Sequence, residues 1–280
     1  MGGLLGCTTV PERSLPLAQS LPEAGAGKNA AVRVQKGLQE AEAGNWEPAM
    51  GYFSDALSYA DLTGLERAIV LNNRGVMQQR MGAHEAAIAD FSAAMKMRAA
   101  LPGSNLPGRA LFNRGVLYYL LAEYAEAEKD LEQYLRHTPP AMRSPYSVLW
   151  LYLARERAGS SGRYGLVSSC KTVWREEECE RKPGEFAHLP WPGAIFAMYL
   201  EQLSAEELIG LVPRGKSERQ GKEYLCDAYF YLGEYYSLKG EYNQARQWWQ
   251  MAVETGMNHL SEYSGSQMAL QRGSVINLSW

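Results

Sequence analysis

Cysteine and histidine are scarce in this chain, and neither is spaced as a metal site requires. There are four residues of each type among 280, too few cysteines for a fold held together by disulfides. The histidines are scattered, without the short ligand spacing of zinc sites. These absences favour a fold held by an apolar core, and a chain of this length can bury a large one.

Strong charge of one sign and long apolar runs are also missing. The formal net charge is −3, so the composition indicates neither a nucleic-acid-binding protein nor a polybasic membrane binder. No apolar stretch of the sequence approaches the roughly 18–20 residues that a bilayer-spanning helix needs. We therefore expect a globular protein of one or two domains.

The first residues resemble the end of a bacterial lipoprotein signal. Residues 1–7 read MGGLLGC, in which two leucines and a glycine precede Cys7. They lack the charged start and the apolar run of roughly 7–15 residues of a complete secretory signal. We expect lipidation of Cys7, with the upstream signal removed or Met1 not the true start. Residues 8–30 are rich in Pro, Ala, Gly and Ser without a sustained apolar period, which predicts a flexible linker.

One pattern recurs four times after the linker. A glycine in an apolar segment is followed by an alanine twelve residues later and by a large apolar residue four residues after that. Glycine costs a helix about 1 kcal/mol relative to alanine, so four at matched places need a packing reason. We predict that each glycine lets a first helix approach a second, with the alanine facing it and the large residue filling the space between. The repeat-packing residues are Gly37, Ala49 and Phe53, then Gly75, Ala87 and Phe91, then Gly115, Ala127 and Leu131, and finally Gly233, Ala245 and Trp249.

The turn between the two helices of each unit has its own signal. Gly44, Gly82 and Gly240 stand where a helix would end in the left-handed conformation that glycine favours. Ala122 occupies the same place in the third unit and departs from the pattern.

These features resemble the tetratricopeptide repeat, a helix–turn–helix unit that stacks into a solenoid. The resemblance implies an all-α fold over residues 31–280, with degenerate middle repeats and a C-terminal capping helix at 259–272. Within the degenerate part, we expect helical structure at residues 144–159 and 191–212. The clear repeats are expected at about 31–63, 67–100, 108–140 and 226–258, and the degenerate ones over 141–225.

Three segments of the second half carry a closer resemblance. They are LWLYLA at 149–154, the run from Trp191 to Leu200, and YFYLGEYYSLKGEYNQA at 229–245, followed by AVETGMNH at 252–259. In this order they resemble the NlpI-type tetratricopeptide outer-membrane lipoproteins, over about residues 65–270. The resemblance implies a non-enzymatic homodimer, anchored by lipid on its N-terminal cysteine at the periplasmic face of the outer membrane. It also implies that the repeats hold peptidoglycan endopeptidases and a carboxyl-terminal processing protease.

The general tetratricopeptide resemblance points to the residues that would contact partners. In tetratricopeptide solenoids the first helix of each unit lines the concave face, where Arg and Asn can hydrogen-bond a partner and aromatic rings can offer apolar contact. For the asparagines of the two Asn-Arg-Gly triplets, hydrogen bonding between helices is the favoured alternative. The candidate partner-binding residues are Asn72, Asn73, Val76, Gln79, Arg80, Arg109, Phe112, Asn113, Val116 and Tyr119.

One group of residues could suggest chemistry. Cys170, Cys179 and His188 follow one another at equal intervals, without the short Cys-x2-Cys or His-x3-His spacing of zinc sites. We therefore expect no metal, no cofactor and no catalytic residues. A Cys170–Cys179 disulfide stays open, because nine residues of continuous helix rise roughly 13.5 Å. The helix would have to break to bring the Cα atoms within the roughly 7 Å that a disulfide allows.

The sequence leaves three functions in order of preference. The first is the envelope adaptor lipoprotein just described. The second is an assembly lipoprotein of a pilus or secretion system. The third is a cytosolic tetratricopeptide co-chaperone, for which Cys7 would be accidental. All three bind proteins, and none binds nucleic acid.

Overall fold

The computed structural model describes residues 20–21, 28–60, 62–97, 106–139, 143–163, 165–167 and 190–276. Cys7, nearly all of the expected linker, and the group of Cys170, Cys179 and His188 lie outside these residues. Within the described residues the regular structure is helical and contains no strand.

The helices follow one another with short connections. They are α1 (Lys28–Glu42), α2 (Trp46–Ser58), α3 (Gly64–Arg80), α4 (His84–Lys96), α5 (Leu106–Leu120), α6 (Tyr124–His137), α7 (Pro145–Ala158), α10 (Gly193–Tyr199), α11 (Ala205–Gly210), α12 (Glu218–Leu238), α13 (Tyr242–Glu254) and α14 (Ser261–Ile276).

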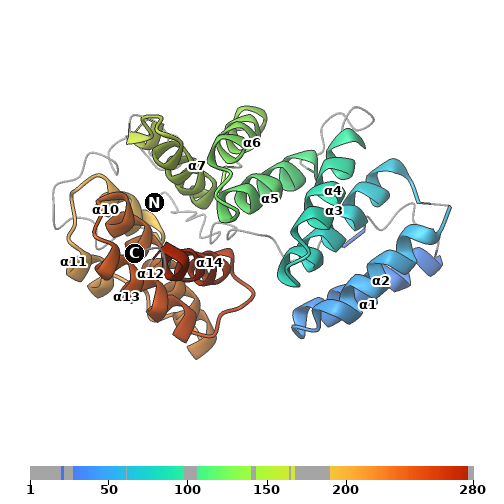
Figure 1. Ribbon diagram of the computed structural model, residues 1–280. Coiled ribbons are helices and arrows are strands. Elements are labelled where there is room, and N and C mark those ends of the chain that lie inside the picture. Colours follow the sequence, from blue (N-terminus) through green and yellow to red (C-terminus); the bar gives the residue numbers. More distant parts are fainter. Residues whose placement is uncertain are drawn as a thin grey trace, which may run out of the picture.

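Helices that are neighbours in the chain are also neighbours in space. From α1 to α7 each helix packs against the next, and α12, α13 and α14 pack in sequence again. Figure 1 shows the resulting arc, with α1 and α2 at one end and α10 to α13 at the other. The predicted all-α solenoid of helix pairs is confirmed by this arrangement.

In each of the four helix pairs that carry the repeat pattern, the helices are closest where the glycine of the first contacts the large residue of the second. A Cβ atom built on Gly37, Gly75, Gly115 or Gly233 would lie no more than 2.9 Å from Phe53, Phe91, Leu131 or Trp249, respectively. Carbon atoms do not approach so closely, so only glycine admits the ring or branched side chain. The four alanines of the pattern are fully buried in the same pairs. The two helices are held in one register by this contact.

The turns within the pairs take the left-handed conformation. Gly44, Gly82 and Gly240 have φ of 82°, 78° and 79°. Ala122, at the equivalent place in the third pair, has φ of 64°. Alanine is strained there because its Cβ crowds the following carbonyl oxygen.

The middle of the chain differs from the expected helices in one place. The segment 191–212, for which helical structure was expected, forms the two short helices α10 and α11, because Glu201 turns the chain with φ of 61°. Ser204 then starts α11 in a capping box, in which its backbone N–H donates to Glu207 at 2.7 Å and its hydroxyl accepts from the Glu207 N–H at 3.2 Å. The Ser-x-x-Glu signal for this start is present in the sequence.

The fourth clear pair starts earlier than the sequence pattern suggests. The pattern places its start at 226, whereas α12 begins at Glu218. The hydroxyl of Ser217 caps α12 by accepting a hydrogen bond from the Gln220 N–H at 3.2 Å. The additional helical turns extend α12 toward the first repeat.

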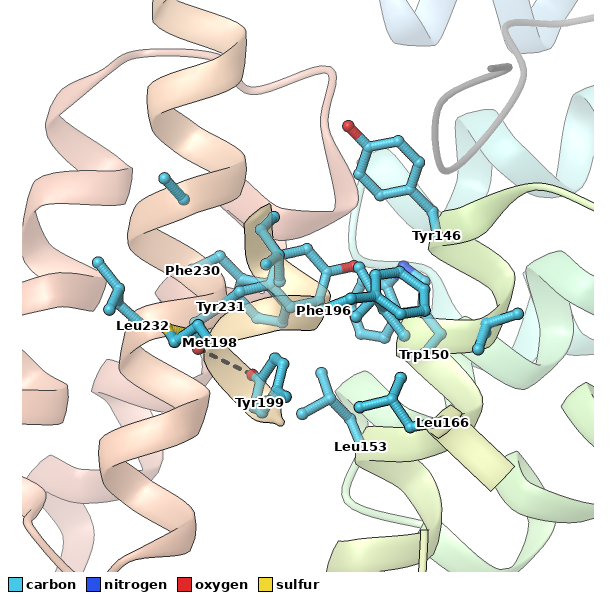
Figure 2. Packing of buried hydrophobic residues seen from close by; sticks show 14 of the residues in the cluster. Tyr146, Trp150, Leu153, Leu166, Phe196, Met198, Tyr199, Phe230, Tyr231 and Leu232 are labelled. Carbon is cyan, nitrogen blue, oxygen red and sulfur yellow. Dashed lines mark hydrogen bonds between the residues drawn. The ribbon is translucent and has the colours of Figure 1, made fainter. Parts of the chain in front are cut away.

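An aromatic core joins the two halves of the chain. Trp150 of α7 lies against Phe230 of α12, with ring centroids 5.2 Å apart. Tyr199 of α10 donates its hydroxyl hydrogen to the Tyr231 carbonyl at 2.8 Å, as Figure 2 shows. This core fixes α10 and α12 against α7, so the arc bends at this point.

Replacing Gly75 by alanine should lower the free energy of unfolding by roughly 1–3 kcal/mol, because the new Cβ would lie 2.8 Å from Phe91. Gly51 in α2 is a matched control, since a Cβ there meets nothing within 4 Å. Gly51→Ala should raise the stability by about 0.5–1 kcal/mol through helix propensity. Urea unfolding followed by circular dichroism measures both, and a shift of the same sign in both would contradict the close approach.

Replacing Ala122 by glycine should stabilise the protein by about 0.5–1 kcal/mol, because strain in the left-handed turn exceeds the entropy that glycine adds to the unfolded chain. The reverse change, Gly82→Ala, should destabilise by a similar amount, since φ of Gly82 is 78° and its Cβ would meet open space. Differential scanning calorimetry of the two variants tests the pair. A lower Tm for Ala122→Gly would show that the turn does not strain alanine.

Candidate functional site

The predicted concave face lies largely inside the molecule. Arg80 and Arg109 are half-buried. The other candidates each expose 6% or less of their surface, and they are Asn72, Asn73, Val76, Gln79, Phe112, Asn113, Val116 and Tyr119. These residues do lie together on α3 and α5, but other parts of the same chain cover them.

Helix α14 is one of the elements that cover this face. It packs on α12 and α13 on one side and on α5 on the other, and in Figure 1 it lies on the inner side of the arc. Arg272 of α14 donates a hydrogen bond to the Leu120 carbonyl, at the end of α5, at 2.7 Å. The predicted capping helix therefore also contacts the inside of the first half.

Arg80, at the end of α3, ties the two halves together. Its Nη1 donates to the carbonyls of Asn258 at 3.2 Å and Leu260 at 3.1 Å, and to the Ser264 hydroxyl at 3.4 Å. Its Nη2 donates to the His259 carbonyl. Burial lowers the pKa of Arg80 to about 10, and Glu262 opposes the shift, so the guanidinium is charged at neutral pH. The turn before α14 is thus held by a cation through backbone carbonyls.

A second polar junction surrounds Glu234, which is 2% exposed. The Tyr119 hydroxyl donates to Glu234 Oε2 at 2.5 Å, and Arg157 Nη2 donates to the same oxygen at 2.7 Å. Burial disfavours the Arg157 cation, but Glu234 outweighs that effect and raises the pKa of Arg157. Helices α5, α7 and α12 meet in this triad. Glu234 was not among the candidate residues. Its position within the aromatic run YFYLGEYY could have indicated a buried carboxylate that needs a partner.

Two of the candidate asparagines join neighbouring repeats, and the arginines of the Asn-Arg-Gly triplets join the two helices within a repeat. Asn113 Nδ2 donates to Asn72 Oδ1 at 3.0 Å, which joins α5 to α3. Asn113 therefore makes a hydrogen bond between helices, as the alternative interpretation of these asparagines predicts. The two arginines of the Asn-Arg-Gly triplets form bidentate pairs, in which Arg74 donates to Asp90 at 2.7 and 2.8 Å and Arg114 donates to Asp130 at 2.7 and 2.9 Å.

An open cleft lies where the two ends of the arc approach each other. Its volume is about 810 Å³, and its walls are the α1–α2 turn, the start of α12 and the α13–α14 turn. Trp46 stands on one wall, and Lys222 and His259 on the other. Burial lowers the pKa of His259, against the opposing effect of Glu223 at 3.0 Å. The cleft therefore offers an indole and charges of both signs, which suits a polar stretch of polypeptide.

The described part of the chain contains neither a metal-binding cluster nor a membrane-spanning helix. No group of three or more His, Cys, Asp or Glu side chains there could hold a metal ion. No helix in that part is long and apolar enough to cross a bilayer. Among the cysteines, Cys226 lies in the described part of the chain, where it is fully buried beside Ala252 and Leu260.

Alkaline pH should destabilise the protein through its buried tyrosines. Burial raises the pKa of Tyr119, Tyr199 and Tyr231 well above 10, whereas in the unfolded chain they ionise near their ordinary pKa of about 10. Above that pH the folded state binds more protons than the unfolded state, so stability falls by about 1.4 kcal/mol per pH unit for each tyrosine.

Urea unfolding between about pH 9 and pH 11 measures this slope, and phenolate absorbance should rise together with unfolding. Tyr199→Phe should reduce the slope of stability against pH by the contribution of one tyrosine, about 1.4 kcal/mol per pH unit. Constant stability across this range would contradict the burial of these hydroxyls.

Comparison with known proteins agrees with the repeat pattern in part of the chain. Residues 66–138, which span most of α3 and all of α4 to α6, match the family model of the tetratricopeptide repeat. Among solved structures, the chain is similar to the C-terminal part of a tetratricopeptide repeat-containing protein from Cytophaga hutchinsonii, at 14% identity and a TM-score of 0.44, over 87% of this chain and 88% of that one. It is also similar to a tetratricopeptide repeat protein from Parabacteroides merdae, at 16% identity and a TM-score of 0.41, over 87% of this chain and 100% of that one.

Tetratricopeptide repeats typically mediate protein–protein interactions by presenting an extended surface built from stacked helix pairs. The matched segment, together with the helix pairs on either side of it, indicates a protein-interaction adaptor.

Proposed function

We propose that this protein is a non-enzymatic adaptor lipoprotein of the bacterial cell envelope. Anchored by lipid on Cys7 at the periplasmic face of the outer membrane, it holds peptidoglycan endopeptidases and a carboxyl-terminal processing protease on its repeats. Bringing protease and hydrolase together on one scaffold controls how much hydrolase remains to cut the cell wall. The adaptor acts as a homodimer.

The observation that carries the adaptor role is the open cleft between the ends of the arc. Two of its walls are helix turns, and the third is the first part of α12. Its charges are paired within the wall, since Lys222 pairs with Glu218 at 2.7 Å and Arg219 with Glu223 at 3.4 Å. His259 hydrogen-bonds with Glu223 at 3.0 Å. A cleft of this kind can bind polypeptide through hydrogen bonds and the Trp46 ring.

The envelope location is supported by the sequence. The lipobox-like residues before Cys7, the Pro- and Ala-rich segment after it, and the NlpI-type order of segments in the second half point in the same direction. Each is independent of the cleft, so the anchor and the adaptor role are tested separately.

Replacing Cys7 by alanine should abolish incorporation of an alkyne-tagged palmitate and move the protein out of the membrane fraction. Cys170→Ala is the matched control and should retain both the label and the membrane fractionation. Equal labelling of wild type and Cys7→Ala would refute the anchor.

Affinity capture from crosslinked cells, read by mass spectrometry, tests the partners. Wall endopeptidases and a processing protease should be enriched with wild type. They should decrease when Lys222→Glu introduces like charge beside Glu218 in the cleft. Enrichment of pilus or secretion components would instead favour the assembly role, and enrichment of cytosolic chaperones without lipid would favour the co-chaperone.

A further inference from the structure

A row of tyrosine rings runs across the place where α7, α10 and α12 meet. Between ring centroids, Tyr152 of α7 lies 4.8 Å from Tyr199 of α10, and Tyr199 lies 5.8 Å from Tyr235 of α12. Tyr236 continues the row, 5.5 Å from Tyr235. Tyr199 is buried, whereas the other three are half-buried and present part of their surface to solvent.

This row lies apart from the cleft and from the buried junction of α12. The cleft is lined by the start of α12 as far as Lys222. Tyr235 lies 13 residues further along the same helix, which is a rise of roughly 20 Å. Tyr235 faces α10, whereas Glu234 contacts α5 and α7. A partner that contacts the row would therefore use a different surface from the cleft.

The chain itself places two cations beside this row. Lys239 Nζ lies 4.3 Å from the centroid of the Tyr235 ring. Arg163 pairs with Glu201, in the turn after α10, at 3.1 Å. A cation over an aromatic face is attracted by the negative charge density of the ring, and a neighbouring carboxylate adds to the attraction. Rings and carboxylates together thus hold basic side chains at this junction.

The third and fourth helix pairs have an equivalent tyrosine near the end of their first helix. In the third pair, the backbone N–H of Glu123 donates to the Tyr118 carbonyl at 2.9 Å. In the fourth pair, the backbone N–H of Glu241 donates to the Tyr236 carbonyl, also at 2.9 Å. The two tyrosines and the two glutamates therefore occupy the same places in their repeats.

The two pairs differ in the residue four positions before this tyrosine. In the third pair that residue is Arg114, whose guanidinium lies over the Tyr118 ring, 5.6 Å from its centroid. In the fourth pair it is Leu232, which carries no charge. Within the described ranges, no lysine or arginine lies over the Tyr236 ring. The fourth pair thus has the ring and the carboxylate of the third pair but lacks its cation.

Two carboxylates stand close to the Tyr236 hydroxyl. They belong to Glu206, in the first turn of α11, and Glu241, at the start of α13, and both residues are exposed. Burial raises the pKa of Tyr236, and the charges of Glu206 and Glu241 raise it further. Neither carboxylate forms an ion pair with another described residue. Their negative charge is therefore available to a basic group of another molecule.

We propose that Tyr236, Glu206 and Glu241 bind an arginine or lysine side chain from a basic segment of a partner protein. The side chain lies over Tyr236 as Arg114 lies over Tyr118, with its stem along the ring and its charged group between the two carboxylates. The inference goes beyond the cleft, because it gives the adaptor a second contact at the other end of α12.

Fluorescence anisotropy of a fluorescein-labelled peptide, GRKGRG, measures this contact on the full-length chain at low ionic strength, where exposed charges are least screened. Glu206→Gln combined with Glu241→Gln should weaken binding at least ten-fold. Glu85→Gln combined with Glu123→Gln is the matched control, because it removes two exposed charges, one of them at the equivalent place in the third pair. This control should bind within two-fold of wild type.

Two substitutions of Tyr236 test the ring. Tyr236→Leu should weaken binding at least three-fold, whereas Tyr236→Phe keeps the aromatic face and should bind as wild type does. The peptide GQQGQG, which lacks the cations, should not bind. Circular dichroism checks the fold of each variant. The Glu206 and Glu241 substitutions change only exposed side chains, so they test the surface even if Tyr236→Leu does not fold.

Equal binding by the Glu206/Glu241 variant and its matched control would show general attraction to an acidic chain and overturn the proposal. Equal binding by folded Tyr236→Leu and wild type would overturn it as well. Lys222→Glu, which alters the cleft, should bind the peptide at least as tightly as wild type, and loss of binding would instead assign the peptide to the cleft. If the peptide binds as expected but affinity capture enriches no envelope protein, this surface stands and the proposed function is refuted.

Discussion

The close approach of two helices at a glycine underlies the architecture of this protein. In each clear pair a large side chain packs where a Cβ would otherwise stand, as Phe91 does at Gly75. The contact fixes the angle and register of the pair, so the pairs present matching surfaces to one another. In the second and third pairs, the bidentate contacts Arg74–Asp90 and Arg114–Asp130 then hold the second helix against the first. The arc in Figure 1 follows from repeating this unit.

The arc encloses its own C-terminal part through polar contacts. Arg80 holds the turn before α14, and Glu234 joins α5, α7 and α12 through Tyr119 and Arg157. Burying charged groups requires that they be paired and hydrogen-bonded, because their desolvation is costly. These junctions therefore specify one relative placement of the two halves. They also remove most of the expected concave face from solvent, which leaves the cleft beside Trp46 as an accessible surface for a partner.

Local signals in the sequence account for much of this fold. The spacing of glycine, alanine and large apolar residue predicts the helix pairs, and Pro145 with Gly159 bounds α7 at both ends. Ser204 and Glu207 mark the start of α11 within 191–212, because a Ser-x-x-Glu sequence can form the capping box seen there. The role of Glu234 could not be predicted, since its partners Tyr119 and Arg157 are far away in the chain. The same holds for buried Asp227, which accepts a hydrogen bond from the Tyr146 hydroxyl at 2.7 Å.

The sequence by itself determined the repeating unit. The glycine of the first helix and the large residue of the second lie close together in the chain, and the missing side chain of one leaves room for the other. It also identified the residues of α3 and α5 that share a face. Only the tertiary structure decided what covers that face. The contacts that place α14 there join Arg80 to residues 258–264, and nothing in the spacing of either segment refers to the other. Whether Arg80 and residues 258–264 meet depends on how much each helix pair between them curves the solenoid.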